Sequence, residues 1–274
     1  MINDQLFLTY RPAPPLHQFV SQLWYWQGVP AAHGKDRLMP DGSGTLIVNL
    51  EEDEVRNYAG LHDDVVERLP GAVLVGAHSR YSVIDTQEQR AVLGVSFRPG
   101  GMWPFFDPAA EELHNQHIGL RDLWGSAGAT LRERILSAPT PVARLRVMEL
   151  ELHARAIRPL ARRPEIAFAV ERLAHPPHDY TIAMISEHIG LSTRRLARLF
   201  SLEVGMTPKL YSRIKRFESV LRLMRPQARV DWSQLALDCG YFDQSHLIHD
   251  CRTISGFTPA ELHSRGSFNL HVPL

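Results

Sequence analysis

A pattern that occurs twice in the last third of the chain constrains the fold more than any other feature. Residues 182–200 read IAMISEHIGLSTRRLARLF, and the same pattern returns about fifty positions later as LALDCGYFDQSHLIHDC, residues 235–251. The spacing is constant up to Gly190 and Gly240, and the second copy then contains one additional residue in the turn. A repeat kept over this length indicates two copies of one structural unit.

Each copy predicts two short helices joined by a glycine turn. In the first copy, Ile182, Ile185 and Ile189 fall at helical spacing. Gly190 takes the left-handed conformation that ends a helix without steric penalty, and Ser192 is a good cap for the next helix. A helix, a turn and a capped basic helix form the outline of a helix-turn-helix unit.

Both copies close with a similar tetrapeptide, GMTP in the first and GFTP in the second. The segment GYFDQSHLIHDCRTISGFTPAEL resembles the second helix-turn-helix of AraC-type regulators (the AraC/XylS family), and GLSTRRLARLFSLEVGMTP resembles their first. The resemblance covers about residues 165–266. It implies a transcription regulator, activator or repressor, with two helix-turn-helix subdomains, about residues 181–206 and 231–257, that read adjacent major-groove segments of double-stranded DNA.

The second helix of each copy presents side chains suited to DNA. Arginine donates two hydrogen bonds to guanine O6 and N7, and glutamine forms a bidentate pair with adenine. The resemblance implies that Arg194 and Arg198 read bases and that Arg195 lies nearer a phosphate. The predicted DNA-binding residues are Ser192, Thr193, Arg194, Arg195, Arg198, Lys209, Gln244, Ser245 and His249.

A helix predicted over residues 208–224 connects the two copies. At about 1.5 Å per residue it spans roughly 25 Å, enough to hold two units near the ~34 Å repeat of adjacent major grooves. Its other basic residues, Arg213, Lys215 and Arg216, suit DNA phosphates and ordinary solvated surface equally well.

The second copy departs from the family pattern at two positions. His249 stands where the family usually has arginine and Cys251 where it usually has phenylalanine, so this unit is less basic. Cys239, His246, His249 and Cys251 together suggest zinc, but their spacing matches no common zinc site. Both cysteines occupy apolar positions of the repeat, so we expect them to be buried, with no metal and no other cofactor.

Charge is divided unevenly between the two parts of the 274-residue chain, although the formal net charge is zero. Residues 1–159 hold 15 Lys and Arg against 19 Asp and Glu, whereas residues 160–274 hold 15 against 11. The positive excess of the second part attracts phosphate. No apolar run of about 18 residues and no signal-peptide pattern occur, so we expect no membrane span and a cytoplasmic location.

The first half predicts short β-strands, rich in β-branched and aromatic residues and bounded by turn residues. They are residues 23–27, 44–50, 72–78, 81–85 and 91–97. We therefore expect an α+β protein, with a mainly antiparallel β-sheet or barrel and helices in the N-terminal part. The C-terminal part should be an all-α double helix-turn-helix.

Helices are predicted over residues 127–137 and 142–157, and the leucines of the second, Leu145, Leu150 and Leu152, suit either a bundle or a homodimer seam. Each proline shortly after this helix disfavours helical geometry in the residue before it. The chain is therefore divided into an N-terminal sensor or dimerisation domain, residues 1–160, and a DNA-binding domain, residues 161–274.

The motifs MPDGSGTLIVNL and GVSFRPGG also resemble a domain of poorly defined role that often precedes AraC-type ends. In many such regulators the N-terminal part is a cupin-like barrel that binds a small effector and dimerises. No cupin metal pattern of closely spaced His and Glu is present. An effector pocket would draw on Trp24, Trp26, His78, Tyr81 and Arg98, which otherwise belong to the core and surface of the sheet.

These observations favour a sequence-specific DNA-binding regulator that responds to a small-molecule effector through its N-terminal domain. One alternative is a regulator controlled by a protein partner through that domain. Another is an enzyme localised to DNA, but no set of nucleophile, base and orienting residue is readable in the sequence, so we expect no catalysis.

Overall fold

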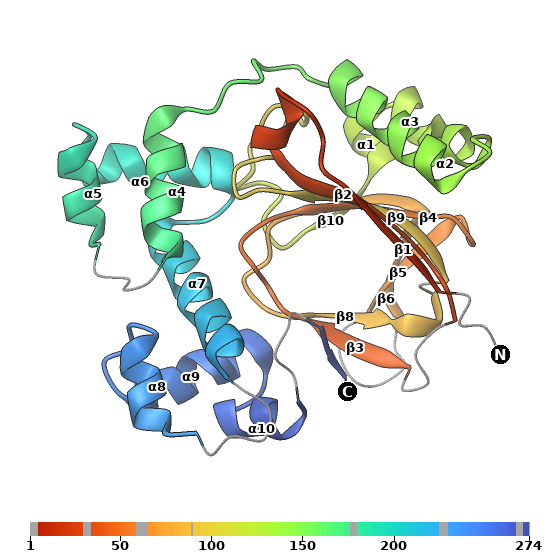
Figure 1. The fold of residues 1–274 in the computed structure, drawn as a ribbon. Coiled ribbons are helices and arrows are strands. Elements are labelled where there is room, and N and C mark those ends of the chain that lie inside the picture. The colour runs from red at the N-terminus through yellow and green to blue at the C-terminus, as the bar shows by residue number, and fades with distance from the viewer. Residues whose placement is uncertain are drawn as a thin grey trace.

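Two antiparallel β-sheets form most of the N-terminal part of the molecule, and helices form the C-terminal part (Figure 1). The computed structural model describes residues 5–29, 34–58, 65–88, 90–175, 180–224, 230–266 and 271–273. The predicted α+β class is confirmed, and the described C-terminal part is helical apart from one short strand, His271–Pro273. Within the described residues, no helix is long and apolar enough to cross a membrane.

The larger sheet has one buried and one partly open face. Its strands, in spatial order, are β1 (Leu6–Tyr10), β2 (Val20–Gln27), β9 (Ala91–Phe97), β4 (Thr45–Asn49), β7 (Ala72–Val75) and β10 (His117–Gly119). Along β2, Leu23 and Tyr25 are buried while Trp24 and Trp26 on the opposite face are half-buried. This alternation follows from the pleat of a strand, which directs successive side chains to opposite faces.

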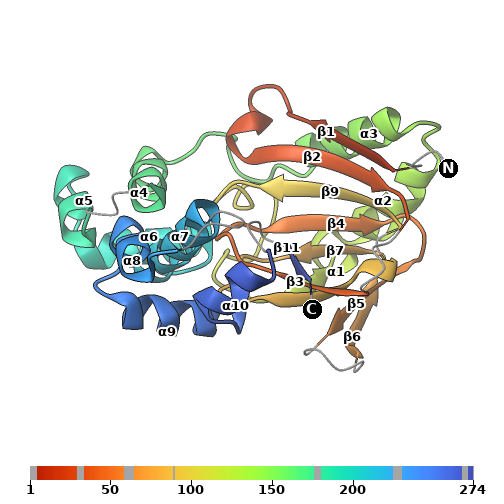
Figure 2. The same ribbon diagram turned by 60° about the horizontal axis from the view of Figure 1, so that its bottom comes forward.

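The smaller sheet contains strands from both ends of the chain. In spatial order they are β11 (His271–Pro273), β3 (Lys35–Leu38), β8 (Ser82–Asp85), β5 (Glu54–Tyr58) and β6 (Val65–Pro70). Figure 2 shows β11, near the C-terminus, lying beside β3. In the described part of the chain the two sheets do not close into a barrel, so the barrel alternative is wrong.

The five predicted strands correspond to β2, β4, β7, β8 and β9. The strand predicted over residues 72–78 ends at Val75, because the chain turns after Gly76 and His78 Nδ1 lies 2.7 Å from the Gly76 carbonyl oxygen. The polar strands β3 and β5 were not predicted, since neither has a run of apolar residues. Short 3-10 helices occupy Leu16–Gln18 and Thr86–Glu88.

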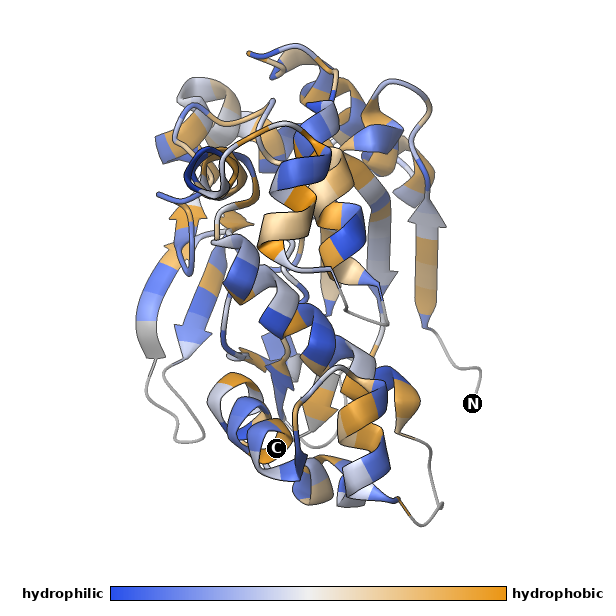
Figure 3. Cartoon of the chain, turned by 90° about the vertical axis from the view of Figure 1, so that its left-hand side faces the viewer, coloured by the Kyte–Doolittle hydropathy of each residue, from blue (hydrophilic) through white to orange (hydrophobic). Residues whose placement is uncertain are grey.

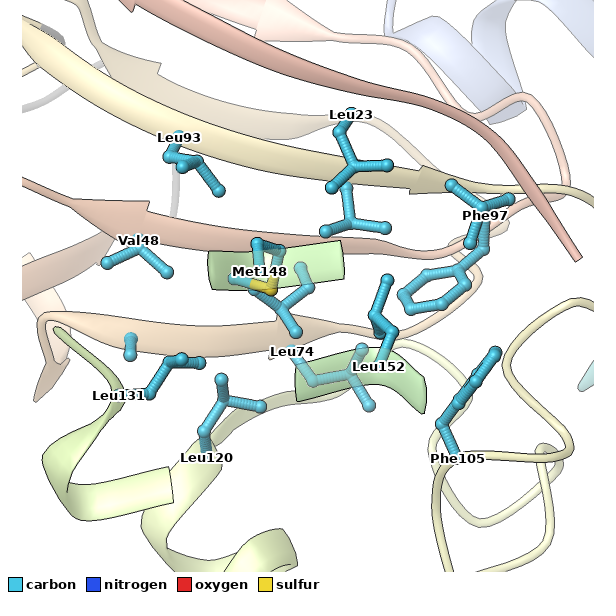
Figure 4. Close-up of a cluster of buried hydrophobic side chains, with 14 of the residues drawn as sticks. Leu23, Val48, Leu74, Leu93, Phe97, Phe105, Leu120, Leu131, Met148 and Leu152 are labelled. Carbon is cyan, nitrogen blue, oxygen red and sulfur yellow. The ribbon is translucent and has the colours of Figure 1, made fainter. Parts of the chain in front are cut away.

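Three helices cover the buried face of the larger sheet: α1 (Leu120–Trp124), α2 (Ser126–Leu136) and α3 (Pro141–Ala154). Figure 4 shows the core between them and the sheet, where Met148 and Leu152 of α3 meet leucines of the strands. Leu145 is also buried in this core, so these side chains pack within the chain, whereas Leu150 is 61% exposed. The helix ends three residues before the predicted boundary, because Ile157 N–H donates to the Pro104 carbonyl.

Within the described residues, seven helices form most of the C-terminal part. They are α4 (Pro164–Ala174), α5 (Ile182–His188), α6 (Thr193–Val204), α7 (Pro208–Leu223), α8 (Trp232–Asp238), α9 (Gln244–Ser255) and α10 (Pro259–Ser264). We call α5 with α6 the first unit and α8 with α9 the second unit; α7 lies between them (Figure 1). Figure 3 shows hydrophobic and hydrophilic segments alternating along these helices, as expected for helices with one buried face.

The repeat is confirmed in the backbone. Gly190 and Gly240, which end α5 and α8, have φ of +71° and +75°. Gly205 and Gly256, which end α6 and α9, have φ of +92° and +75°. Each of these conformations is one that glycine adopts without penalty, so the same turn chemistry shapes both units.

Candidate nucleic-acid interface and ligand cavity

The first unit presents a capped helix with exposed arginines. Ser192 Oγ accepts a hydrogen bond from the Arg195 backbone N–H at 3.2 Å, so the predicted cap begins α6. The opposite side of the helix is anchored by Leu196 and Phe200, both fully buried. Arg194, Arg195 and Arg198 are exposed, and none of them forms an ion pair within the described residues. Ser192 and Thr193 are exposed at the same end.

The second unit has the same geometry but a less basic surface. Asp243 caps α9, its Oδ1 accepting the His246 backbone N–H at 2.7 Å. Ser245 and His249 are exposed, while Gln244 is half-buried and its Oε1 accepts a hydrogen bond from Ser233 Oγ at 3.4 Å. Gln244 and Ser245 are uncharged, so His249 is the only one of these three residues that can carry a positive charge.

The two cysteines lie inside the core of the second unit. Cys239 and Cys251 are both fully buried among apolar side chains. Burial raises the pKa of the Cys239 thiol to about 12 and also raises that of Cys251. Because a metal-binding cysteine is a thiolate, this environment disfavours metal ligation and suits packing.

Most basic residues of α7 have internal roles. Arg213 Nε lies 2.7 Å from Oδ1 of Asp250, a buried carboxylate on α9, and Arg216 stacks over the Tyr241 ring. Lys215 pairs with Glu218 at 2.7 Å. These residues therefore attach the second unit to α7 or pair along the helix, whereas Lys209 at the start of α7 is exposed.

The first unit is attached to the N-terminal part near the loop that follows β9. Arg163 Nε lies 2.6 Å from Glu203 Oε1 of α6, and this hydrogen bond raises the pKa of Arg163. Ala110 N–H donates to the Leu202 carbonyl at 2.9 Å, and Arg162 donates to the Pro99 carbonyl at 2.7 Å. Of these contacts, the Ala110–Leu202 hydrogen bond joins the first unit itself to the N-terminal part, while Arg162 and Arg163 lie just before α4.

The second unit contacts the N-terminal part through Arg37 of β3. The Arg37 side chain donates to the Ser255 carbonyl at 2.9 Å and lies between the rings of Tyr81 and Phe257, 4.2 and 3.9 Å from their centroids. Burial lowers the pKa of Arg37. Tyr81 N–H donates to the Ile254 carbonyl at 2.9 Å, so the end of α9 is fixed by both residues.

A cavity of about 550 Å³ lies between the two sheets. Its lining comes from both: Phe7, Gln22, Trp24, Trp26, Asp36, Leu38, Met39, Pro40, Asp41, Ser43, Thr45, Ile47, Val75, Gly76, His78, Ser82, Ile84, Thr86 and Ser96. Three of the five residues predicted for an effector pocket, Trp24, Trp26 and His78, are among them. Tyr81 and Arg98 are not: Tyr81 contacts Arg37, and Arg98 is exposed and donates to the His17 carbonyl.

Individual side chains of the cavity are held by specific contacts. Trp24 lies so close to β9 that a Cβ at Gly94 would sit 2.1 Å from its ring, and its Nε1–H donates to Ser96 Oγ at 3.2 Å. The pKa of His78 is lowered, mainly by burial, so this ring is neutral at pH 7. The neighbouring His117, whose ring centroid is 4.8 Å away, has its pKa lowered to about 4, also by burial.

Residues 36–42, which we call the wall segment, separate the cavity from the helical part. Asp36, Leu38 and Asp41 line the cavity, while Arg37 points to the second unit. Met39 lines the cavity and also belongs to the core of the second unit. At Gly42 the segment lies against Tyr211 of α7, where a Cβ would be 2.8 Å from the ring. The motif MPDGSGTLIVNL includes residues 39–42 of this segment, but the sequence did not place it between the cavity and the helical part, because that position depends on which strands pair.

The comparisons with known proteins agree with this organisation. Residues 8–119 match a domain of unknown function (DUF6597), and residues 185–265 match a helix-turn-helix domain. No curated protein matches the chain.

Three solved structures show the extent of structural similarity. A DNA-binding transcriptional dual regulator from Escherichia coli K-12 is 23% identical, with a TM-score of 0.32 over 40% of this chain and 98% of that one. ToxT from Vibrio cholerae is 8% identical, with a TM-score of 0.40 over 95% and 98% of the two chains. Unsaturated fatty acid bound ToxT is 10% identical, with a TM-score of 0.41 over 95% and 96%.

The assignment rests on the repeated helix-turn-helix with its GYFDQSH and GFTP motifs and on the matching domain over residues 185–265. Residues 185–265 form a helix-turn-helix domain of the AraC type, the kind that DNA-binding transcription regulators carry, and residues 8–119 form a domain of unknown function.

Proposed function

We propose that this regulator recognises a specific DNA sequence with α6 and α9 and that a small molecule in the N-terminal cavity controls the recognition. The observation that supports this most directly is the position of the wall segment, residues 36–42. One side of it lines the cavity and the other contacts the second unit and α7. A ligand that moves this segment changes the surface on which the helical part rests.

For DNA recognition, the exposed arginines of α6 are the strongest support. Arg194 and Arg198 extend from a capped helix without an internal ion-pair partner among the described residues. A bidentate arginine–guanine pair contributes about 1–3 kcal/mol of discrimination. We assign base contacts to these two residues, phosphate contacts to Arg195 and Lys209, and a weaker base-reading role to Gln244, Ser245 and His249. Ser192 and Thr193 lie at the helix N-terminus, where backbone N–H groups and hydroxyls suit a phosphate.

For effector binding, the size and lining of the cavity are the support. Its volume of about 550 Å³ falls within the usual range for small-molecule sites, roughly 300–1,000 Å³. Apolar surface makes up most of the wall, and nine of the nineteen lining residues contribute polar side chains. Such a composition can orient a ligand while excluding water.

Control of DNA binding requires that the ligand bind two arrangements of the molecule unequally. Met39 and Arg37 provide a route, because Met39 touches both the cavity and the core of the second unit and Arg37 fixes the end of α9. We propose that ligand binding alters this contact and thereby the orientation of the second unit relative to the first.

The test compares the natural chain with a variant whose cavity is filled. Ile47→Trp places a large ring into the cavity from β4, and Val142→Trp makes the same kind of enlargement at an exposed position of α3. A metabolite library is screened by thermal unfolding of the full chain, and each compound that stabilises it is assayed for a change in DNA affinity. We expect stabilisation to be lost in Ile47→Trp and kept in Val142→Trp.

We expect the compounds that stabilise the natural chain to change its affinity for its preferred DNA site as well. Stabilisation that survives in Ile47→Trp would move the ligand site elsewhere. A compound that binds in the cavity but leaves DNA affinity unchanged would remove the regulatory part of the proposal.

A further inference from the structure

The cavity contains acidic side chains but no Lys or Arg among the described residues that line it. Asp36 and Asp41 contribute carboxylates, and His78, the histidine of the lining, is neutral at pH 7 because burial lowers its pKa. Oδ1 of Asp41 accepts hydrogen bonds from the backbone N–H and the hydroxyl of Ser43, at 2.8 and 2.7 Å. Within the described residues Oδ2 of Asp41 accepts no hydrogen bond, which leaves this oxygen for a ligand.

The two basic residues of β3 point away from the cavity. On β3, Asp36 and Leu38 face the cavity, and the alternation of the strand sends Lys35 and Arg37 to the other side. Lys35 Nζ lies 4.3 Å from the centroid of the Tyr58 ring, and Arg37 lies between two rings at the second unit. Strand β3 thus directs its acidic side chain, Asp36, into the cavity and its two basic side chains to the opposite face, which makes this wall of the cavity negative.

The opposite wall is aromatic. Trp24 and Trp26 lie on the same face of β2, and the Phe7 ring of β1 lies 6.4 Å from that of Trp26. The Trp24 N–H donates its hydrogen bond to Ser96, so a ligand in the cavity meets the Trp24 ring rather than a free N–H group. Aromatic faces attract cations, with tryptophan the most effective.

We propose that the cavity binds an organic cation, a positively charged nitrogen on an aromatic or aliphatic body, and selects against carboxylates and other anions. This inference rests on the proposed function and specifies the chemical class of its effector. The body fills the space between Trp24 and Ile47, and the charged nitrogen lies toward Asp41. An anion in the same place would lose its hydration next to carboxylates without meeting a basic side chain, which is unfavourable.

The experiment uses three compounds that share one apolar body and differ in charge. They are 4-phenylbutylamine, which is a cation at pH 7, 4-phenylbutan-1-ol, which is neutral, and 4-phenylbutyrate, which is an anion. Each is titrated into the full chain by isothermal calorimetry at low ionic strength. We expect the amine to bind most tightly and the acid most weakly, with about tenfold or more between them.

A charge-neutral variant identifies the carboxylate responsible. Asp41→Asn keeps an oxygen for the Ser43 hydrogen bonds and removes the charge, so the preference for the amine over the acid should fall by about threefold or more. Asp107→Asn is the matched control: it removes one negative charge from an exposed position outside the cavity and should leave the preference unchanged.

The outcomes separate this inference from the proposed function. If the acid binds as tightly as the amine or more tightly, and Ile47→Trp abolishes that binding, the cavity remains a ligand site and the inference about charge is wrong. The inference is also wrong if the amine does not bind, or if it binds Ile47→Trp as tightly as it binds the natural chain. The proposed function is then tested by the library screen alone. Equal preferences in Asp41→Asn and the natural chain would overturn the role of Asp41.

Discussion

The first helix-turn-helix unit exposes Arg194 and Arg198, whereas the second presents Ser245 and His249 at the corresponding positions of the repeat. The attachments differ as well. The Ala110 N–H of the N-terminal part donates to the Leu202 carbonyl of the first unit, whereas the second unit contacts β3 through the buried side chain of Arg37. The two copies of one local fold therefore differ in their exposed charge and in how they contact the N-terminal part.

The largest expected difference between the units concerns the ion pair that joins each of them to a neighbouring segment. Arg213→Ala leaves Asp250 buried, 3% exposed, without its main cationic partner, which we expect to lower the free energy of unfolding by about 3 kcal/mol. Arg163→Ala should cost less, about 2 kcal/mol, because Glu203 is 8% exposed and Arg163 is 42% exposed, so water replaces part of the interaction. Chemical denaturation of the full chain measures both.

Arg252→Ala, a change of the same kind at an exposed position of α9, serves as the control for general effects of removing an arginine. Equal losses for Arg213→Ala and Arg163→Ala would show that the two pairs stabilise their units alike.

The second prediction concerns DNA. Arg198→Ala should weaken binding to the preferred site by about 2 kcal/mol and relax discrimination at one base position, because a bidentate contact is lost. His249→Ala, at the matching position of the second unit, should lose less than about 1 kcal/mol. Binding of a randomised DNA pool followed by sequencing gives both effects. A uniform loss across all sequences for Arg198→Ala would reassign that residue to a phosphate.

The third prediction concerns a substitution that weakens the contact of the second unit, but not that of the first, with the N-terminal part. Arg37→Met keeps an apolar chain between Tyr81 and Phe257 but removes the hydrogen bond to the Ser255 carbonyl and the cation, at a cost of about 1–2 kcal/mol. Amide hydrogen exchange should become faster in α9 and α10 and stay unchanged in α5 and α6. Faster exchange in both units would mean that they are attached to the N-terminal part as one body.

The smallest expected effect comes from making the units more alike. His249→Arg gives the second unit an arginine at the position equivalent to Arg198. We expect DNA affinity to rise by about 0.5–1 kcal/mol and the slope of log affinity against log salt to steepen by about one. Fluorescence anisotropy at several salt concentrations measures both. An unchanged slope would indicate that this position does not approach the DNA backbone.

Local chemistry explains why the helical part could be predicted closely. The glycine turns, the cap of α6 by Ser192 and the buried cysteines all follow from residues near each other in the chain. The N-terminal part was less predictable: three of its five candidate pocket residues line the cavity, but Tyr81 and Arg98 do not. Residue type alone cannot distinguish an aromatic at a cavity from one at an interface between parts of the molecule.

By itself, the sequence determined the repeated helix-turn-helix, its turns, its uneven charge and its resemblance to a family, because each of these depends on residue type and on spacing along the chain. Tertiary structure alone decided that β3 and β11, from opposite ends of the chain, pair in one sheet and that Asp36 and Arg37 face different surroundings. The physical reason lies in strand geometry. Alternation assigns neighbouring residues to opposite faces, but only the pairing of distant strands determines what lies on each face.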